Sequence, residues 1–252
     1  MQDTERNGLW ERYWHALPDN KGIAVWDSDP ELNAAVHLSW FRPYFRTDLP
    51  LIDLGCGNGT QTAFLARHYA PVLGLDVSPT AVDRAARAHS GATLSFRQFD
   101  VVDTVAGAAL HAEFGDCNVY VRTLLHLLSD DARKAAVQTI AALLGKTGGL
   151  FIAELAHSSI PVFEDALALG DESVPKIRHN LRSGIVGANL LPGELEKLLS
   201  GVGIRVIAQG EATMLSTDRT SDGAELVIPL DYVLGGTERH DFFAPGDTSD
   251  DH

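Results

Sequence analysis

The sequence predicts a doubly wound α/β fold, in which helices cover both faces of a seven-stranded sheet whose last strand is antiparallel. Three observations support this fold. Short apolar runs with the length of strands alternate with helical patterns between about residues 49 and 155. A turn with three glycines joins the first apolar run to the first helical pattern. The chain has 252 residues, of which 45% are hydrophobic, and this is enough to build the core of one such domain with a modest cap.

The expected strands are short apolar runs that glycine, proline or polar residues bound on either side. They cover 49–54, 72–76, 94–99, 117–121, 150–154, 204–214 and 226–234. Only the polar stretch 216–223 separates the last two, so they are close enough to form a hairpin.

Helices are expected between the strands, over 60–68, 79–89, 129–144 and 192–200. The second begins with Ser78 as an N-cap and Pro79 at the first helical position, which is a favourable start. Ser129 caps the third helix in the same way. Glycines at 91, 145 and 201 follow these helices, and glycine is a common residue at a helix end.

Segments outside this alternation are expected to flank the sheet. Trp10, Tyr13 and Trp14 fall on one helical stripe ahead of the first strand, which indicates a helical cap. In the stretch 156–190 the apolar residues no longer recur at a regular spacing, and several prolines and glycines occur. This pattern indicates an insertion with one or two short helices. The expected boundaries are 1–48 for the N-terminal helical cap, 49–240 for the sheet domain, 156–190 for the inserted cap and 241–252 for an acidic flexible tail.

The composition excludes several classes of partner. The formal net charge is −14, and a surface that negative repels phosphate backbones and acidic lipids, so neither nucleic acid nor a membrane is expected as a partner. No stretch approaches the roughly 20 apolar residues of a membrane helix.

Cys56 and Cys117 form no metal-like cluster or disulfide framework, and with no export signal in the sequence they are expected to be reduced thiols of a cytoplasmic protein. No metal is expected, since no His, Asp and Glu residues have ligand spacing.

The main chemical signal is the stretch LIDLGCGNGT at 51–60. A strand ends near Asp53, three glycines alternate, and a helix begins. Glycine allows a ligand to approach the backbone closely, and the helix start offers free N–H groups. Ligands of open α/β sheets bind at this edge of the sheet. A nicotinamide-dependent oxidoreductase would use G-x-G-x-x-G, whereas the third glycine here comes one residue early.

With an acid two residues ahead of these glycines, the chain resembles the class I S-adenosylmethionine-dependent methyltransferase family. The resemblance implies a Rossmann-like domain and S-adenosylmethionine as cofactor. It implies that Asp76, at the end of the second strand, binds the ribose hydroxyls, and that Asp100 meets the adenine, with Asp103 as the alternative. The residues expected to bind the cofactor are Asp53, Gly55, Cys56, Gly57, Gly59, Asp76, Val77, Asp100, Val101 and Arg122.

The part of the site that contacts the substrate is expected just beyond the fourth strand. His126 is the candidate general base, because a neutral imidazole titrates in the useful pH range; packing near a helix start is the alternative. Arg122 is also a catalytic candidate, and it is expected to pair with a substrate carboxylate or with an acidic residue near the cofactor. The N-terminal aromatics loosely resemble the thiopurine and tellurite-resistance branch, in which an N-terminal segment closes over the cofactor. The candidate substrate residues are Trp14, Trp26, His37, Glu154 and His179.

The expected function is therefore methyl transfer to an oxygen or nitrogen of a small molecule, by a monomer or homodimer with a substrate cap at 156–190. Three alternatives stay open. They are a non-catalytic cofactor-binding or partner-binding protein, a nicotinamide-dependent oxidoreductase, and a methyltransferase that acts on nucleic acid or protein.

Overall fold

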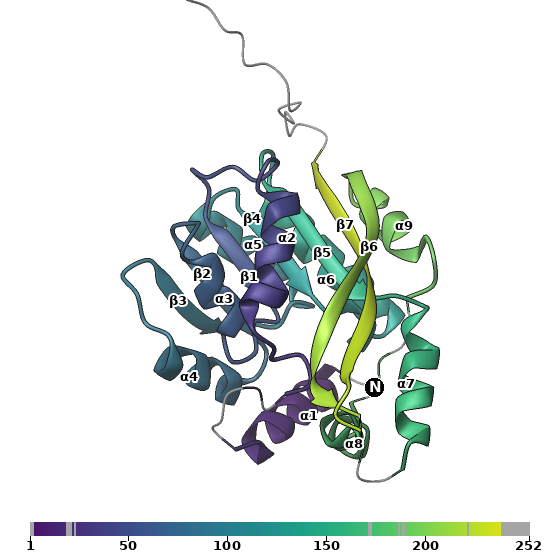
Figure 1. Cartoon of the computed structure of the whole chain (residues 1–252). Helices are drawn as coiled ribbons and strands as arrows, with labels where there is room; N and C mark the ends of the chain where they lie inside the picture. Colours follow the sequence, from purple (N-terminus) through teal and green to yellow (C-terminus); the bar gives the residue numbers. More distant parts are fainter. Residues whose placement is uncertain are drawn as a thin grey trace, which may run out of the picture.

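The computed structural model describes residues 3–18, 22, 24–170, 173–185, 187, 190–220 and 222–237 (Figure 1). The expected acidic tail at 241–252 lies outside the described residues. Within the described part of the chain, none of the helices combines the length and the apolar character needed to cross a bilayer.

The sheet has seven strands among the described residues, in the order β3-β2-β1-β4-β5-β7-β6. Strands β1 to β5 pair in parallel, and β7 lies antiparallel between β5 and β6, so the predicted doubly wound sheet is confirmed. The strands are β1 (Leu51–Leu54), β2 (Val72–Asp76), β3 (Leu94–Gln98), β4 (Asn118–Arg122), β5 (Gly149–Leu155), β6 (Ile204–Arg219) and β7 (Glu225–Thr237).

Helices occupy the connections between the strands. They are α1 (Asp3–Ala16), η1 (Pro30–Leu32), α2 (Ala34–Phe41), α3 (Thr60–Leu65), α4 (Pro79–Ala88), α5 (Thr104–Phe114), η2 (Leu125–Leu127), α6 (Asp130–Leu144), α7 (Ser159–Ala168), α8 (Pro175–Arg182) and α9 (Glu194–Ser200). Ser78 and Ser129 cap α4 and α6 as expected, each accepting from a backbone N–H. The sequence reasoning assigned no element to α5.

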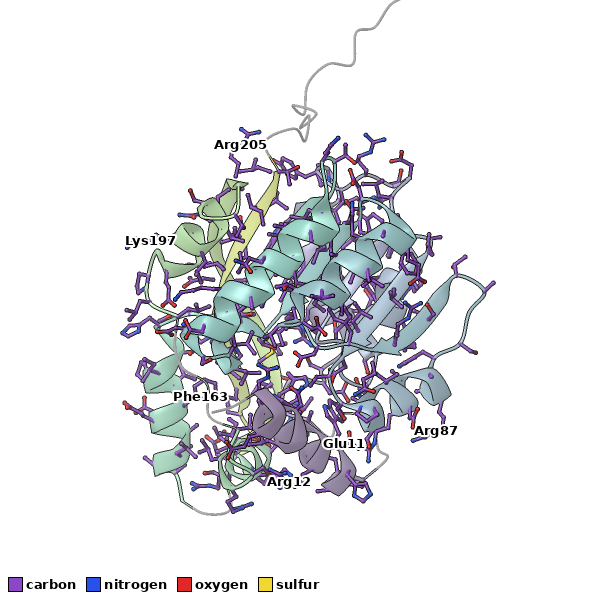
Figure 2. The ribbon with its side chains drawn as sticks, turned by 180° about the vertical axis from the view of Figure 1, so that it is seen from behind. Glu11, Arg12, Arg87, Phe163, Lys197 and Arg205 are labelled. Carbon is purple, nitrogen blue, oxygen red and sulfur yellow. The ribbon has the colours of Figure 1, made fainter. Side chains whose placement is uncertain are left out.

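Successive strand residues point to opposite faces of the sheet, and each face has its own core. Ile52 and Ile152 contribute to the core that α5, α6 and α9 share. Leu51 and Phe151, one position earlier in each strand, pack instead against α2 and α3. Figure 1 shows α2 and α3 over the near face of the sheet, and Figure 2 shows the helices on the opposite face. The alternation explains why the buried strands read as continuous apolar runs.

Three helices gather at one end of the sheet, where α1 lies near α8 and α7 (Figure 1). The hydrogen bonds of Glu11 fix α1 to α4: its carboxylate accepts from the Ser78 hydroxyl at 2.6 Å and from the Thr80 hydroxyl at 2.5 Å. The Arg84 guanidinium adds a bond from α4 to the Leu17 carbonyl, at 2.5 Å, just past the end of α1. Helix α1 is therefore held against the carboxyl ends of the strands.

Asp103 is the N-cap of α5 rather than a ligand-facing acid, because its Oδ1 accepts from the backbone N–H of Val105 at 3.1 Å and of Ala106 at 2.9 Å. We expect Asp103→Ala to lower the free energy of unfolding by about 1 kcal/mol, the usual effect of losing such a cap. Urea unfolding measures this change. An unchanged midpoint would show that α5 does not need its cap.

Candidate active site

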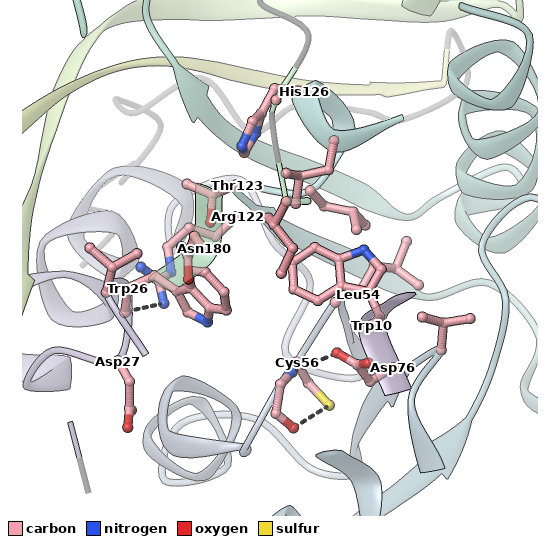
Figure 3. A pocket seen from close by; sticks show the side chains of 18 of the residues that line it. Trp10, Trp26, Asp27, Leu54, Cys56, Asp76, Arg122, Thr123, His126 and Asn180 are labelled. Carbon is pink, nitrogen blue, oxygen red and sulfur yellow. Dashed lines mark hydrogen bonds between the residues drawn. The ribbon is translucent and has the colours of Figure 1, made fainter. Parts of the chain in front are cut away.

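A cavity of ≈ 290 Å³ opens at the carboxyl ends of β1, β2 and β4 (Figure 3). The neighbours of β1 explain its position. Since β1 pairs with β2 on one side and with β4 on the other, the loops that follow β1 and β4 turn to opposite faces of the sheet and leave a crevice between them. Helices α1, α7 and α8 and the β6–β7 hairpin line the rest of the cavity.

The turn after β1 lies along the floor of the cavity. The N–H groups of Gly55 and Cys56 both donate to the Leu75 carbonyl, at 2.8 and 2.9 Å. Gly57 has a φ of +55°, and a Cβ there would lie 3.0 Å from the Trp14 ring. Glycine is therefore required both by the backbone and by the close packing of α1.

Gly59 differs from the other two glycines of the turn. It has a φ of +78°, and a Cβ there would lie 2.7 Å from Phe96 and 2.9 Å from Ala85. It does not line the cavity. The small size of Gly59 serves the packing beneath the turn, and its contact with the cofactor stays a prediction.

Asp76 ends β2 and joins two turns. Its Oδ2 accepts from the Gly57 N–H at 2.9 Å, and its Oδ1 accepts from the Ser78 N–H at 2.9 Å. Burial raises the pKa of Asp76 to about 6, although these amides favour the ionised form. Asp76 and Val77 both line the cavity.

Asp53, the next-to-last residue of β1, lies beneath the same turn and lines the cavity. Its Oδ2 accepts from the Thr62 hydroxyl at 2.6 Å. Burial raises the pKa of Asp53 to about 6, against the opposing effects of Thr62 and of the Arg122 charge. Two buried acids at one end of a cavity favour a ligand with a positive charge nearby.

Asp100 is bound by the N-terminal helix. The Arg6 guanidinium donates to its carboxylate at 2.8 Å, and the Asn7 amide donates at 2.7 Å. Asp100 and Val101 line the cavity, as does Arg6. This contact could not be predicted from the sequence, because Arg6 lies 94 positions before Asp100.

His126, which lies in η2 after β4, forms a buried pair with Glu154 of β5. Glu154 accepts from the N–H groups of Leu124 at 2.9 Å, of Leu125 at 2.7 Å and of His126 at 3.3 Å. The His126 Nδ1 lies 2.7 Å from the same carboxylate. Because that carboxylate is an acceptor for all three amides, we assign the hydrogen to Nδ1, which leaves Nε2 of the neutral ring as an acceptor.

The backbone conformation at Thr123 helps to direct the His126 ring toward the cavity. Thr123 has a φ of +51°, an uncommon conformation for a β-branched residue, and its N–H donates to the Ala153 carbonyl at 2.8 Å. The chain turns sharply there, and the amides that follow reach Glu154. His126 lines the cavity, and Figure 3 shows its ring above Thr123 and Arg122.

Arg122 reaches into the cavity from the last position of β4. Its Nη2 donates to the Trp26 carbonyl at 3.0 Å (Figure 3). Its Nη1 lies 3.1 Å from the Met214 sulfur. Trp26 lines the cavity, as do Trp10 and Trp14 of α1. The Trp10 and Trp26 rings meet edge to face, with centroids 5.9 Å apart.

Three candidate substrate residues do not line the cavity: His37, Glu154 and His179. The His37 Nδ1 lies 2.9 Å from the Tyr120 hydroxyl, and its ring packs against Phe151. Burial first, and then the Arg122 charge, lower the pKa of His37 to about 3. Glu154 is occupied by the loop amides, and the His179 ring packs 5.5 Å from Tyr13. All three side chains lie outside the lining of the cavity, and substrate contact by them stays a prediction.

Several residues that line the cavity were not among the predicted site residues, Asn180 and Tyr120 among them. Asn180 of α8 has a buried Oδ1 without a hydrogen-bond partner among the described residues. Tyr120 of β4 has its hydroxyl beside His37. The fold brings both residues to the cavity. Among the residues described, no group of three or more His, Cys, Asp or Glu side chains is arranged to hold a metal ion.

Comparison with known proteins gives concordant matches. A family model described as a methyltransferase domain matches residues 51–149. A crystal structure of an S-adenosylmethionine-dependent methyltransferase from Anabaena variabilis is 31% identical, with a TM-score of 0.86, and the match covers 92% of this chain and 94% of that one.

Two curated relatives match shorter stretches. A ubiquinone biosynthesis O-methyltransferase from Methylobacterium nodulans is 31% identical over 66% of this chain and 64% of its own length. A carboxy-S-adenosyl-L-methionine synthase from Trichodesmium erythraeum is 28% identical over 53% of this chain and 52% of its own. The chain therefore spans between half and two thirds of the length of these two curated relatives.

The raised pKa of Asp53 makes the stability of the protein depend on pH in a defined direction. Since the folded-state pKa of about 6 lies above the ordinary 3.8, protonated Asp53 stabilises the fold below pH 3.8, and this contribution is lost as the pH rises through 6. Asn does not titrate. We therefore expect the stability of Asp53→Asn, relative to the wild type, to rise between pH 4 and 6 by up to about 3 kcal/mol.

Urea unfolding at pH 4, 5, 6 and 8 measures this difference. Asp83→Asn, which removes the same charge from an exposed site on α4, is the matched control and should show no comparable rise. A difference that stays constant, or falls, across this range would show that the Asp53 carboxylate is not destabilised by burial.

Proposed function

Because the chain belongs to the class I S-adenosylmethionine-dependent methyltransferase family, we propose that it transfers a methyl group from S-adenosylmethionine to an oxygen or nitrogen atom of a small molecule. One observation carries the proposal: a single cavity joins the acids and glycines at the ends of β1, β2 and β3 to an apolar chamber under α7 and α8. An enclosed chamber of this kind suits a small acceptor better than a polymer.

The residues at the first end of the cavity fit the cofactor. Gly55 and Gly57 line the cavity with backbone that carries no side chain, so a ligand can lie close to the turn. The Asp76 carboxylate can accept from both hydroxyls of a ribose. Asp100 and Val101 lie at the end of β3, where we assign the adenine, with Cys56 and Val77 lining the path between. The buried Asp53 favours the cationic part of the molecule.

Bound S-adenosylmethionine supplies a methyl group that its sulfonium already activates. The chain then has to orient the acceptor and exclude water. The Trp10, Trp14 and Trp26 rings line the cavity beside the glycine turn, and α1 carries the first two over it. An aromatic lining of this kind excludes water and suits a nearby cation.

We assign the general base to His126. Its Nε2 takes the proton that the acceptor hydroxyl or amine loses as the new bond to the methyl carbon forms. Glu154 acts as a positioning residue, since it accepts from Nδ1 and also holds the loop that carries the ring. An oxygen acceptor agrees with the O-methyltransferases among the curated relatives.

The first prediction for this function concerns the cofactor. We expect Asp76→Ala to weaken the binding of S-adenosylhomocysteine by about 1–3 kcal/mol, because a charged acceptor for the ribose is lost. Isothermal titration calorimetry measures this. Asp103→Ala removes the same charge outside the cavity and should leave the affinity unchanged. An unaltered dissociation constant in Asp76→Ala would remove the assigned ribose contact.

The second prediction concerns the base. We expect His126→Gln to lower kcat by roughly 10²- to 10⁴-fold, and to leave the S-adenosylhomocysteine affinity unchanged, because Gln cannot take a proton at the acceptor. The assay follows S-adenosylhomocysteine release with a phenol, catechol or amine found by screening. His68→Gln, at an exposed position after α3, is the matched control. Wild-type turnover in His126→Gln would exclude His126 as the base.

A further inference from the structure

We propose that the methyl acceptor carries a carboxylate on an otherwise apolar body, and that Arg122 binds this carboxylate. The inference rests on the proposed function and names its substrate class. It depends on four features of the chamber: the hydrogen-bond partners of Arg122, the titratable groups around Arg122, the unused N–H donors of its guanidinium, and the apolar walls.

The first feature is the set of partners that Arg122 has. Its two hydrogen-bonding contacts go to the Trp26 carbonyl and to the Met214 thioether, and neither group is charged. Among the described residues, no carboxylate lies within 4.0 Å of this guanidinium. The other guanidinium that lines the cavity belongs to Arg6, which is paired with Asp100. Arg122 is thus the cation of the chamber that lacks a direct countercharge in the described part of the chain.

The second feature is that none of its titratable neighbours in the described part of the chain forms a direct ion pair with it. The low pKa of His37, about 3, keeps that ring neutral, and burial raises the pKa of the Tyr120 hydroxyl. Asp53 is near enough for its charge to act on Arg122, but its carboxylate bonds to Thr62 instead. A cation in a mostly apolar chamber is costly until an oxyanion pairs with it.

The third feature is the geometry of the guanidinium. It has five N–H donors in a planar fork, and the contacts with Trp26 and Met214 engage only two of its nitrogens. A carboxylate matches such a fork with two parallel hydrogen bonds, which a neutral group does less well. Asn180 adds a carboxamide to the lining, with its Oδ1 buried and unpartnered, and so offers a polar contact for a second group of the acceptor.

The fourth feature is the apolar character of the surrounding walls. Residues from α7, α8 and the β6–β7 hairpin supply them: Phe163, Leu167, Ile177, Leu181, Met214 and Ile228. One charged anchor among apolar walls is the arrangement that recognises a small aromatic or aliphatic carboxylic acid. The same carboxylate chemistry occurs in the methionyl part of the cofactor, and the experiment has to separate these two sources.

The test compares matched carboxylates and amides on the protein saturated with S-adenosylhomocysteine. The probes are benzoate, phenylacetate, 2-naphthoate and octanoate, each with its primary carboxamide, and calorimetry gives the dissociation constants. We expect at least one carboxylate to bind the wild type about 10- to 100-fold more tightly than its amide. Arg122→Met should abolish this preference, and Arg122→Lys should keep part of it. Arg67→Met, which removes an exposed cation, should retain the preference in full.

Cofactor binding is measured separately with S-adenosylhomocysteine and with 5′-methylthioadenosine, which lacks the amino-acid part. We expect Arg122→Met to leave both affinities within about threefold of the wild type. If it weakens only S-adenosylhomocysteine, Arg122 binds the cofactor's carboxylate and the proposal is overturned. It is also overturned if no carboxylate binds better than its amide, or if the preference survives in Arg122→Met.

The outcomes also distinguish this proposal from the function on which it rests. Intact S-adenosylhomocysteine binding without any carboxylate preference contradicts only the substrate class. Absence of S-adenosylhomocysteine binding to the wild type contradicts the methyltransferase proposal itself. A thermal melt of each variant establishes that it is folded, and Arg122→Gln replaces Arg122→Met if the latter does not fold.

Discussion

Two buried carboxylates hold the loops on which the pocket is built. Asp76 binds the amides of Gly57 and Ser78, which fixes the turn after β1 to the turn after β2. Glu154 binds the amides that follow β4, which fixes that loop to the end of β5. The sheet reverses its order between these loops, so the parallel strands open a crevice and the two carboxylates determine its shape.

The electrostatic character of the pocket follows from the same burial. Asp53 and Asp76 are kept from water at one end, and each has a pKa raised to about 6. Arg122, at the end of the neighbouring strand β4, is near enough for its charge to act on Asp53, while its hydrogen-bonding contacts go to neutral groups. The lining of the cavity therefore brings buried acids and a guanidinium together at the carboxyl ends of adjacent strands.

The parts of the site that lie close together in the sequence could be predicted from it. The turn at 51–60 and the acid at the end of the next strand are local signals, because a strand, a glycine turn and a helix start follow one another directly. The strands were predictable for a similar reason, since apolar runs between turns need no distant partner. Helix α5 was missed, although Asp103 has the residue type of an N-cap.

The contacts that depend on the tertiary fold could not be predicted in this way. Arg6 reaches Asp100 only because α1 folds back across the ends of the strands. His37 was expected at the substrate, but strand β4 presents Tyr120 to it and buries the ring away from the cavity. Glu154 was expected to face the substrate, and instead the amides after β4 use both of its oxygens. In each case a long-range partner decides which group a polar side chain binds.

The aromatic lining has an optical consequence. The chain contains four tryptophans, and three of them, Trp10, Trp14 and Trp26, line the cavity, whereas Trp40 stacks on Tyr232 elsewhere. Most of the indole side chains of the protein therefore lie at this cavity. Indole fluorescence depends on the surroundings of the ring, so a molecule that occupies the cavity is expected to change the intrinsic fluorescence of the unlabelled protein.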